Sequence, residues 1–575
     1  MLDLLLQQAG ESEPGFASET IKWAIHCTGE GRFTGVTALG EEGKGQLFAH
    51  CPKTPNMNAG GKSHFLADSL AAVVLFFDDE PDGTRNHKIK EEDRDRFGKR
   101  HSFFLDLLRQ AQEVLPALAA PVHMVEDAEQ RAQMYAALKQ NKAKPTEMAT
   151  FALAGEIFLA SREWHEWWRS YLRPSAESGA PVGALMRDFV TGALVKPAGT
   201  HPKVTGLAGV GGLGTGDVLA GFDKEAFQSF GLEKSCNAAM SNESATAYAE
   251  TLNRLIREKR VRLGNTLCTY WFTESIPDDD NPLSWIEEPE ESTRASAEQR
   301  AKVLLEAIRS GQRAEVTGCR YVALLLSGAA GRVMVRDVMQ DSFEGLAAHV
   351  VQWFQDLAIV HREGKTMAPA PKLLAIAGAL VRELKDLPPP VIQQLWRAAL
   401  TGAGIPHVAM AQATLRARMD VIADASFNHA RMGLIKAFHV RQGDQEMQPY
   451  LNPEHPSSAY QCGRLLAVLA GLQRAALGDV GAGVVQRYYT AASQTPGMVL
   501  GRLVANAKNH LGKLDGGLSW WYEERIAEVM SRLGDQIPLT HSLQEQSLFA
   551  LGYYQQLAFS RAGKQTDIAP ASPSD

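Results

Sequence analysis

The pattern of apolar residues changes near residue 343, and this change constrains the fold more than any other feature of the chain. Before it, short runs rich in β-branched and aromatic residues alternate with helical segments and Gly-rich polar loops. After it, helix-length segments follow one another, interrupted by proline or glycine at Pro388 to Pro390, Pro406, Pro449, Pro453, Pro456, Gly478 to Gly483 and Pro538. We therefore predict an α+β protein with a mixed α/β region over residues 1–340, a helical connecting region over 341–446 and a C-terminal helical bundle over 447–575.

The length and charge of the chain limit its function. A chain of 575 residues with 45% apolar content can bury a large core and corresponds to about three or four domains. Its net charge is −7, whereas proteins that hold nucleic acid by themselves are usually basic. This balance disfavours autonomous tight DNA binding. It still permits local basic patches, because charges act mainly within about 10 Å at ordinary salt.

The sequence predicts a reduced, cytoplasmic protein. The six cysteines are scattered, with no Cys-x-x-Cys pair and no histidine at zinc-finger spacing. The start of the chain has no basic segment of the kind that opens a secretion signal, and no apolar run reaches the roughly 18 residues of a membrane span. The tail after Lys564 has the composition of a disordered segment.

Several catalytic motifs are imitated but incomplete. Residues 209–214 satisfy G-x-G-x-x-G, but no buried strand precedes them, which leaves a DNA-facing loop or a plain surface loop. Residues 60–63 end like a phosphate-binding loop, yet Asn56 occupies the position of its first glycine. His165-Glu166 lacks the second histidine of a zinc protease, because position 169 is Arg169. We therefore expect no catalytic residues, no metal and no cofactor.

Residues 321–327 and 332–338 form two β-prone runs separated by Gly328-Ala329-Ala330-Gly331, a spacing that predicts a hairpin. The period of two places Arg332, Met334 and Arg336 on one face of the second strand. The two arginines could contact nucleic-acid phosphates or form ordinary salt bridges, and the sequence does not decide between these roles.

A short polar loop carries side chains of the types that reach base edges and phosphates, namely Lys53, Asn56, Asn58, Lys62, Ser63 and His64. A solvated loop without function is the alternative interpretation.

The segment after Pro496 predicts an amphipathic helix. An apolar stripe contains Leu500, Leu503, Ala507 and Leu511, and the opposite face carries Arg502, Asn506, Asn509 and Lys513. Such a face can follow a single-stranded backbone, together with Arg464, Arg487 and Lys508. A solvated exterior face is the alternative. The pairs Tyr488-Tyr489 and Tyr553-Tyr554 are predicted to be core residues rather than base-stacking platforms.

The chain resembles a known family along nearly its whole length. Near the C-terminus, Phe549, Gly552, Tyr553, Tyr554 and Gln556 fit the family's Gly-Tyr-Tyr signature. Further matches occur in order at Phe65 to Asp68, Val190 to Gly192, His201 to Gly206, Asn237, Ala247-Tyr248, Leu252-Asn253, Leu326-Ser327, Leu400 to Gly402, Ile435 to Ala437, Tyr460, Gly463 to Leu465, Arg487 to Tyr489 and Ala492-Ser493. On these residues the chain resembles the large subunit of the type I-C CRISPR surveillance complex, Cascade. The family's Ser-Pro-Asn-Ala-Ala-Arg pattern is altered at residues 327–332, where the Pro and Asn are missing.

The resemblance implies a recognition subunit rather than an enzyme. Its expected tasks are to read the protospacer-adjacent motif (PAM) in duplex DNA through the N-terminal domain and the polar loop, to help open the duplex for R-loop formation, and to hold the displaced strand for a helicase-nuclease in antiviral defence. Lys203 joins the candidates for backbone contact. Expected partners are backbone subunits, the subunit that processes and caps the crRNA, the crRNA, target DNA, the helicase-nuclease, and small subunits made from the C-terminal region by an internal start, for which Met447 is favoured over Met432. The alternatives are a ribonucleoprotein scaffold without DNA reading and a metal- or nucleotide-dependent enzyme.

Overall fold

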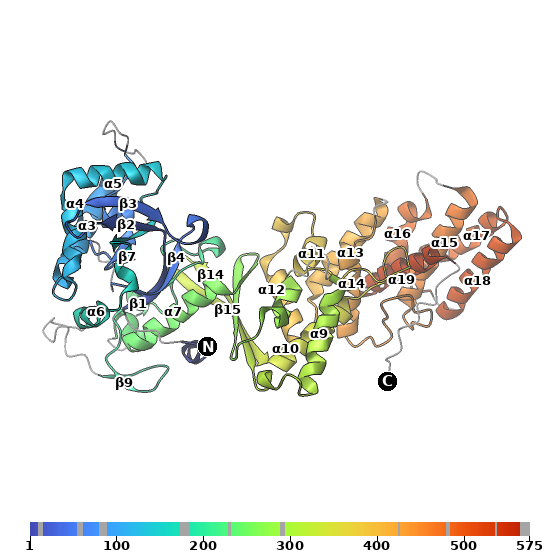
Figure 1. The fold of residues 1–575 in the computed structure, drawn as a ribbon. Helices are drawn as coiled ribbons and strands as arrows, with labels where there is room; N and C mark the ends of the chain where they lie inside the picture. Colours follow the sequence, from blue (N-terminus) through green and yellow to red (C-terminus); the bar gives the residue numbers. More distant parts are fainter. Residues whose placement is uncertain are drawn as a thin grey trace. The chain divides into compact units, whose positions relative to one another are not determined.

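The computed structural model describes residues 1–9, 15–54, 61–79, 85, 89–172, 185–222, 224–227, 232–287, 294–423, 426–478, 483–534 and 537–563. The chain forms two compact units, which Figure 1 shows as a ribbon coloured along the sequence. Unit 1 contains Met1–Gly206 and Leu213–Glu258, and unit 2 contains Leu207–Gly212 and Lys259–Asp575. The predicted boundaries near residues 340 and 446 both fall within unit 2, and the three-part division stays a prediction.

Unit 1 is built on two small sheets. In the first, β1 (Phe16–Ile21) pairs antiparallel with β4 (Gln46–Pro52). The second has the order β3-β2-β6-β5, with β7 added to β6. Its strands are β2 (Trp23–Cys27), β3 (Phe33–Ala38), β5 (Ala67–Ser69), β6 (Met148–Leu153) and β7 (Glu156–Ile157). Only β2 and β6 run parallel, and this pair brings segments more than 120 residues apart into register.

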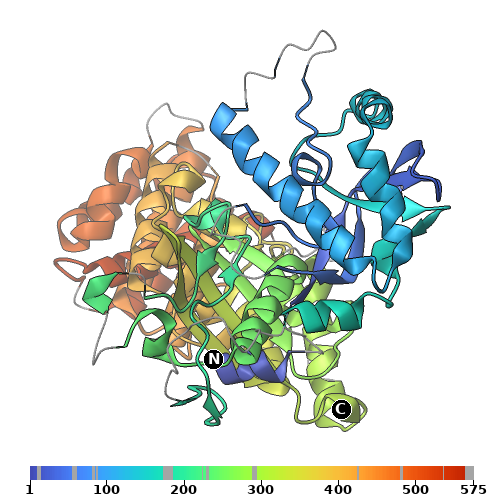
Figure 2. The same cartoon turned by 90° about the vertical axis from the view of Figure 1, so that its left-hand side faces the viewer.

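The helices α2, α4 and α5 contact the second sheet of unit 1. The longest helix of this unit is α3, which Figure 2 shows in blue. The helices of the unit are α1 (Leu2–Gln7), α2 (Leu70–Val73), α3 (Glu91–Ala111), α4 (Ala119–Glu126), α5 (Ala128–Gln140), α6 (His165–Leu172) and α7 (Asn242–Glu258). Asp127 begins α5 by accepting hydrogen bonds from the Glu129 and Gln130 amides. Two further hairpins pair β8 (Met186–Arg187) with β9 (Leu194–Val195), and β10 (Lys203–Val204) with β11 (Asp217–Val218).

Unit 2 begins with an antiparallel meander in the order β12-β13-β14-β15. Its strands are β12 (Arg260–Leu263), β13 (Thr266–Phe272), β14 (Arg320–Ala329) and β15 (Arg332–Ser342). The predicted hairpin is confirmed as β14 and β15. Its two-residue turn has positive φ at Ala330 (48°) and Gly331 (95°), as the right-handed twist of a tight hairpin requires.

The rest of unit 2 is helical, and the α+β prediction is confirmed. The first helix after the meander, α10, begins at Phe343 with Ser342 as its N-cap. The helices are α8 (Pro282–Glu287), α9 (Arg294–Arg309), α10 (Phe343–Leu357), α11 (Leu373–Ala379), α12 (Pro389–Thr401), α13 (His407–Ile422), α14 (His429–Arg441), α15 (Ser458–Leu477), α16 (Val484–Gln494), α17 (Pro496–Leu511), α18 (Gly516–Leu533) and α19 (Leu543–Ala562). The prolines at the starts of α12 and α17 occupy first-turn positions, where the missing N–H costs nothing.

One continuous core runs through unit 2, from Val261 in β12 to Ala558 in α19. The predicted apolar stripe of α17 lies in it, since Leu500, Leu503 and Ala507 are buried. Met447, the expected internal start, is also a buried member of this core. Among the described residues, none of the helices combines the length and the apolar character needed to cross a bilayer.

Candidate nucleic-acid interface

The predicted polar loop is closed at its base by hydrogen bonds between its two ends. The Thr54 hydroxyl donates to the Ser63 carbonyl at 2.6 Å, and the Thr54 amide donates to His64 Nδ1 at 3.1 Å. Asn56 and Asn58 lie outside the described residues. The loop therefore starts and ends on a defined platform in unit 1.

The buried Asp68 carboxylate stabilises this platform through hydrogen bonds. The carboxylate accepts hydrogen bonds from the Ser63 hydroxyl (2.7 Å), from the His64 amide (2.9 Å) and, through both of its oxygens, from Arg100 at 2.7 and 2.9 Å. Burial opposes ionisation of Asp68, but Arg100 and the hydrogen bonds outweigh it, so the pKa of Asp68 is lowered from its ordinary value. Ser63 is fully buried and supports the platform, so its hydroxyl does not face a nucleic acid.

The remaining described residues of the loop differ in whether their side chains are available to contact a nucleic acid. Lys53 forms an ion pair with Glu19 at 2.5 Å. Burial, aided by Lys53, lowers the pKa of His64 to about 4. His64 is therefore neutral near pH 7, and because Nδ1 accepts from Thr54, its proton is on Nε2 and can be donated. The half-buried Lys62 ammonium has no ion pair within the described ranges.

The arginines of the hairpin are partly engaged. Arg336 is exposed at a bulge in β15, and its Nε donates to the Ser327 hydroxyl at 2.8 Å. Arg332 is half-buried. In unit 1, Lys203 is half-buried, and its carbonyl accepts a hydrogen bond from Asn253 at 3.1 Å, which ties β10 to α7. Phosphate binding by Arg332 and Arg336 stays a prediction.

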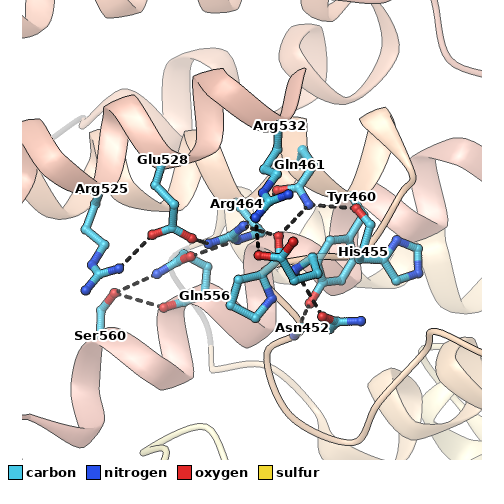
Figure 3. A network of polar contacts seen from close by, with 12 residues as sticks. Asn452, His455, Tyr460, Gln461, Arg464, Arg525, Glu528, Arg532, Gln556 and Ser560 are labelled. Atoms are coloured by element: carbon cyan, nitrogen blue, oxygen red, sulfur yellow. Dashed lines mark hydrogen bonds and ion pairs between the residues drawn. The ribbon is translucent and has the colours of Figure 1, made fainter. Parts of the chain in front are cut away.

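Arg464 has a structural role, and the prediction that it contacts a nucleic-acid backbone is corrected. The side chain is only 1% exposed. Figure 3 shows it within a network that joins α15 to α18 and α19. Its guanidinium donates to Gln556 Oε1, Glu528 Oε1, Gln461 Oε1 and the Pro453 carbonyl at 2.8 to 3.1 Å. Every nitrogen of the guanidinium is thus engaged inside the protein.

The C-terminal signature is likewise structural. Tyr554 donates its hydroxyl to the Val360 carbonyl at 2.5 Å, and Gln555 donates to the Gln448 carbonyl at 2.8 Å. Tyr489, Tyr553 and Tyr554 are buried, which confirms that they belong to the core. The signature therefore holds α19 in place within unit 2.

The predicted basic helix forms as α17, and its polar face is exposed. We define the α17 polar face as Arg502, Asn506 and Asn509 of the helix together with Lys513 in the turn that follows it, and all four residues lie at the surface. Lys508 of α17 and Arg487 of α16 are also exposed. Within the described part of the chain, none of the four cations Arg487, Arg502, Lys508 and Lys513 has a carboxylate at ion-pair distance. A chain of net charge −7 thus leaves a group of cations unneutralised.

A pocket adjoins this face between α15, α16 and α17, with a volume of about 170 Å³. It is lined by Leu469, Leu472, Gln473, Val484, Arg487, Tyr488, Leu503, Asn506, Ala507 and His510. The structure therefore brings together two predicted residues, Arg487 and Asn506. Tyr488 was predicted to be a core residue, but it is only half-buried and lines the pocket. His510 was missed as a site residue, because no motif marks it and only the packing of three helices places it here.

The imitated motifs have structural explanations. Gly211 has a φ of 91°, and Gly212 lies so close to Gly328 of β14 that a Cβ on Gly328 would overlap its backbone. Residues 209–214 neither follow a buried strand nor open a helix, so they do not form a dinucleotide site. In the described ranges, no group of three His, Cys, Asp or Glu residues is placed to hold a metal ion.

Comparison with known proteins identifies the family. A search of curated proteins found no match. The family model described as CRISPR-associated protein (Cas_Csd1) matches residues 4–559, which is nearly the whole chain. The family predicted from the sequence is therefore confirmed, and the chain belongs to the Cas_Csd1 family of CRISPR-associated proteins.

Proposed function

We propose that this chain is the large subunit of a type I-C Cascade complex, with a role in recognition rather than catalysis. It reads the PAM through the N-terminal unit, helps open the duplex for R-loop formation, and holds the displaced strand along α17 while the helicase-nuclease is recruited. Its partners are the backbone subunits, the crRNA-processing cap subunit, the small subunits and the crRNA. Membership of the Cas_Csd1 family supports this assignment.

The observation that carries the proposal is the group of unneutralised cations at α16 and α17. Arg487, Arg502, Lys508 and Lys513 are exposed and have no ion pair within the described residues. Cations without local partners attract phosphates, and the amides of Asn506 and Asn509 add hydrogen-bond donors to the same surface. A single strand tolerates such a surface because its backbone can follow it and its bases remain accessible.

The platform under the polar loop supports PAM reading. Thr54, His64 and Asp68 hold the two ends of the loop together, so the loop is presented from a rigid base. His64 Nε2 and the Lys62 ammonium supply donors of the kind that reach base edges and phosphates. Preorganised donors are expected to discriminate among base pairs better than mobile ones, because binding orders them at a smaller entropic cost.

The strand-holding role is tested with guide-loaded complexes on matched duplex targets. Arg502→Glu combined with Lys508→Glu should weaken target binding at least tenfold. The slope of log K against log salt should also become shallower by about 0.7 for each phosphate that the protein no longer neutralises. The matched control is Arg382→Glu, an exposed arginine after α11 without an ion pair in the described residues. Equal affinities for the double variant and the control would reject strand holding at α17.

The PAM-reading role is tested by the ratio of affinities for correct and scrambled PAMs. Lys62→Ala should reduce this ratio, whereas Lys44→Ala, which removes an exposed lysine paired with Glu42, should not. An unchanged ratio with Lys62→Ala would reject the assignment to this residue. No PAM dependence in the wild-type complex would favour the scaffold function instead.

A further inference from the structure

The pocket between α15, α16 and α17 is not explained by backbone binding alone. Backbone contacts need only exposed cations, yet this surface is hollowed beside the α17 polar face. Asn506 belongs to both the polar face and the pocket lining, and Arg487 stands in the lining while remaining exposed. A strand that follows the cations therefore passes beside the pocket.

A flat heteroaromatic ring requires an apolar surface and hydrogen-bonding groups, and the pocket lining contains both. The apolar part consists of Leu469, Leu472, Val484, Leu503 and Ala507. Tyr488 adds an aromatic ring, on which a base can stack. The volume of about 170 Å³ is below the range of sites for drug-sized ligands and suits a single small ring system.

Polar groups in the lining remain available for a ligand. His510 Nδ1 is buried and has no hydrogen-bond partner among the described residues, which is uncommon for a buried polar atom. Gln473 uses its Oε1 to accept from the Val484 amide at 2.7 Å, which orients the side chain and leaves its NH₂ group for other acceptors. Asn506 offers both a donor and an acceptor.

The charge of the lining selects the class of ligand. Arg487 is the one formally charged side chain among the lining residues, and none of them is a carboxylate. An apolar pocket with amide and imidazole groups and a cation at its edge fits an uncharged base attached to a phosphate. It fits a cationic peptide side chain poorly, because no carboxylate in the lining can pair with it.

We propose that this pocket takes one unstacked nucleobase of single-stranded DNA, with Tyr488 as the stacking surface, Asn506, Gln473 and His510 as hydrogen-bonding groups, and Arg487 on the adjoining phosphate. The proposal rests on the strand-holding function proposed above and deepens it. Strand holding then has two components, a salt-dependent one from the cations and a base-dependent one from the pocket. Stacking of one base on an aromatic side chain contributes about 1–3 kcal/mol, which corresponds to roughly 5- to 150-fold in affinity.

The two components are separated by comparing oligothymidylate with an abasic oligonucleotide of the same length and charge, using the full chain and fluorescence anisotropy. Wild type should bind the thymidylate at least about fivefold more tightly. Ala507→Leu narrows the pocket, and Tyr488→Leu removes the stacking ring while keeping an apolar side chain. Each should bring the affinity ratio close to one and leave binding of the abasic strand unchanged.

The matched control is Ala505→Leu, the same substitution two residues away at an exposed position of α17. It should keep the wild-type ratio. Thermal unfolding of each variant shows whether it is folded, and Tyr488→Leu covers the case in which Ala507→Leu fails to fold.

The possible outcomes are distinct. A ratio near one in wild type, or a ratio that survives both pocket variants, overturns the pocket proposal. A second outcome is that the thymidylate and the abasic strand bind with equal affinity and both lose affinity with Arg502→Glu. In that case strand holding stands and only the pocket proposal is rejected. If neither strand binds the full chain, the pocket proposal fails, and strand holding is decided separately by the Arg502→Glu and Lys508→Glu variant in the guide-loaded complex.

Discussion

Gly463 of α15 and Gly552 of α19 each face the backbone of the other helix where the two helices pack together. A Cβ atom on Gly463 would overlap the Phe549 carbonyl oxygen, and one on Gly552 would overlap the Tyr460 carbonyl oxygen. Both glycines are matched positions of the family resemblance. They are needed because the helix backbones approach too closely for any side chain.

Gly463→Ala should therefore destabilise unit 2 by about 3 kcal/mol, since the helices must move apart. The matched control is Gly501→Ala in α17, where no heavy atom lies within 4 Å of the added Cβ. This change should stabilise the protein by about 0.5–1 kcal/mol through helix propensity. Chemical denaturation measures both, and equal effects would contradict the close packing of α15 and α19.

The buried position of Arg464 predicts a loss of stability rather than a specific loss of DNA binding. Arg464→Ala leaves the amide oxygens of Gln461 and Gln556 without their donor, and should cost about 3–5 kcal/mol. Arg474→Ala, at an exposed position of the same helix, should change stability by less than about 0.5 kcal/mol. A folded Arg464→Ala protein of normal stability that bound DNA weakly would restore the original prediction.

His439 predicts a dependence of stability on pH. Burial lowers the pKa of His439 to about 4, and its Nε2 lies 2.7 Å from the Ser547 hydroxyl. In the unfolded chain the group titrates near 6.5, so between about pH 6.5 and 4 the unfolded state binds a proton that the folded state does not. Stability contributed by neutral His439 is complete above pH 6.5 and decreases as the pH falls towards 4.

The measurement is the free energy of unfolding of wild type and His439→Gln at pH 7.5 and pH 5. Wild type should lose about 2 kcal/mol more than the variant over this interval, because about 1.5 pH units below 6.5 are crossed. Identical losses in the two proteins would show that His439 is not held neutral by the fold.

Asp68 predicts coupling between the platform and PAM reading. Asp68→Asn leaves the half-buried Arg100 without its charge partner and should destabilise unit 1 by about 3 kcal/mol. In complexes that still assemble, the ratio of affinities for correct and scrambled PAMs should fall, because the ends of the loop are no longer held together. A stable variant with an unchanged ratio would show that the platform does not support the loop.

Local patterns determined much of the fold from the sequence alone. The β14–β15 hairpin, the start of the helical part at Phe343 and the apolar stripe of α17 follow from periodicity and from turn and breaker residues, which act over a few neighbours. The exposed face of α17 was predictable for the same reason, since helical spacing alone places Arg502, Asn506 and Asn509 together.

Only the tertiary structure decided which polar residues are available to a ligand. Arg464 and Arg502 are both arginines on amphipathic helices, yet one is buried by α18 and α19 and the other is exposed. Ser63 and Lys62 are neighbours in one polar loop, but Asp68 holds the first in the interior. The pocket lining likewise comes from three helices. Burial depends on contacts between distant segments, and a sequence pattern read over a few residues contains no information about those contacts.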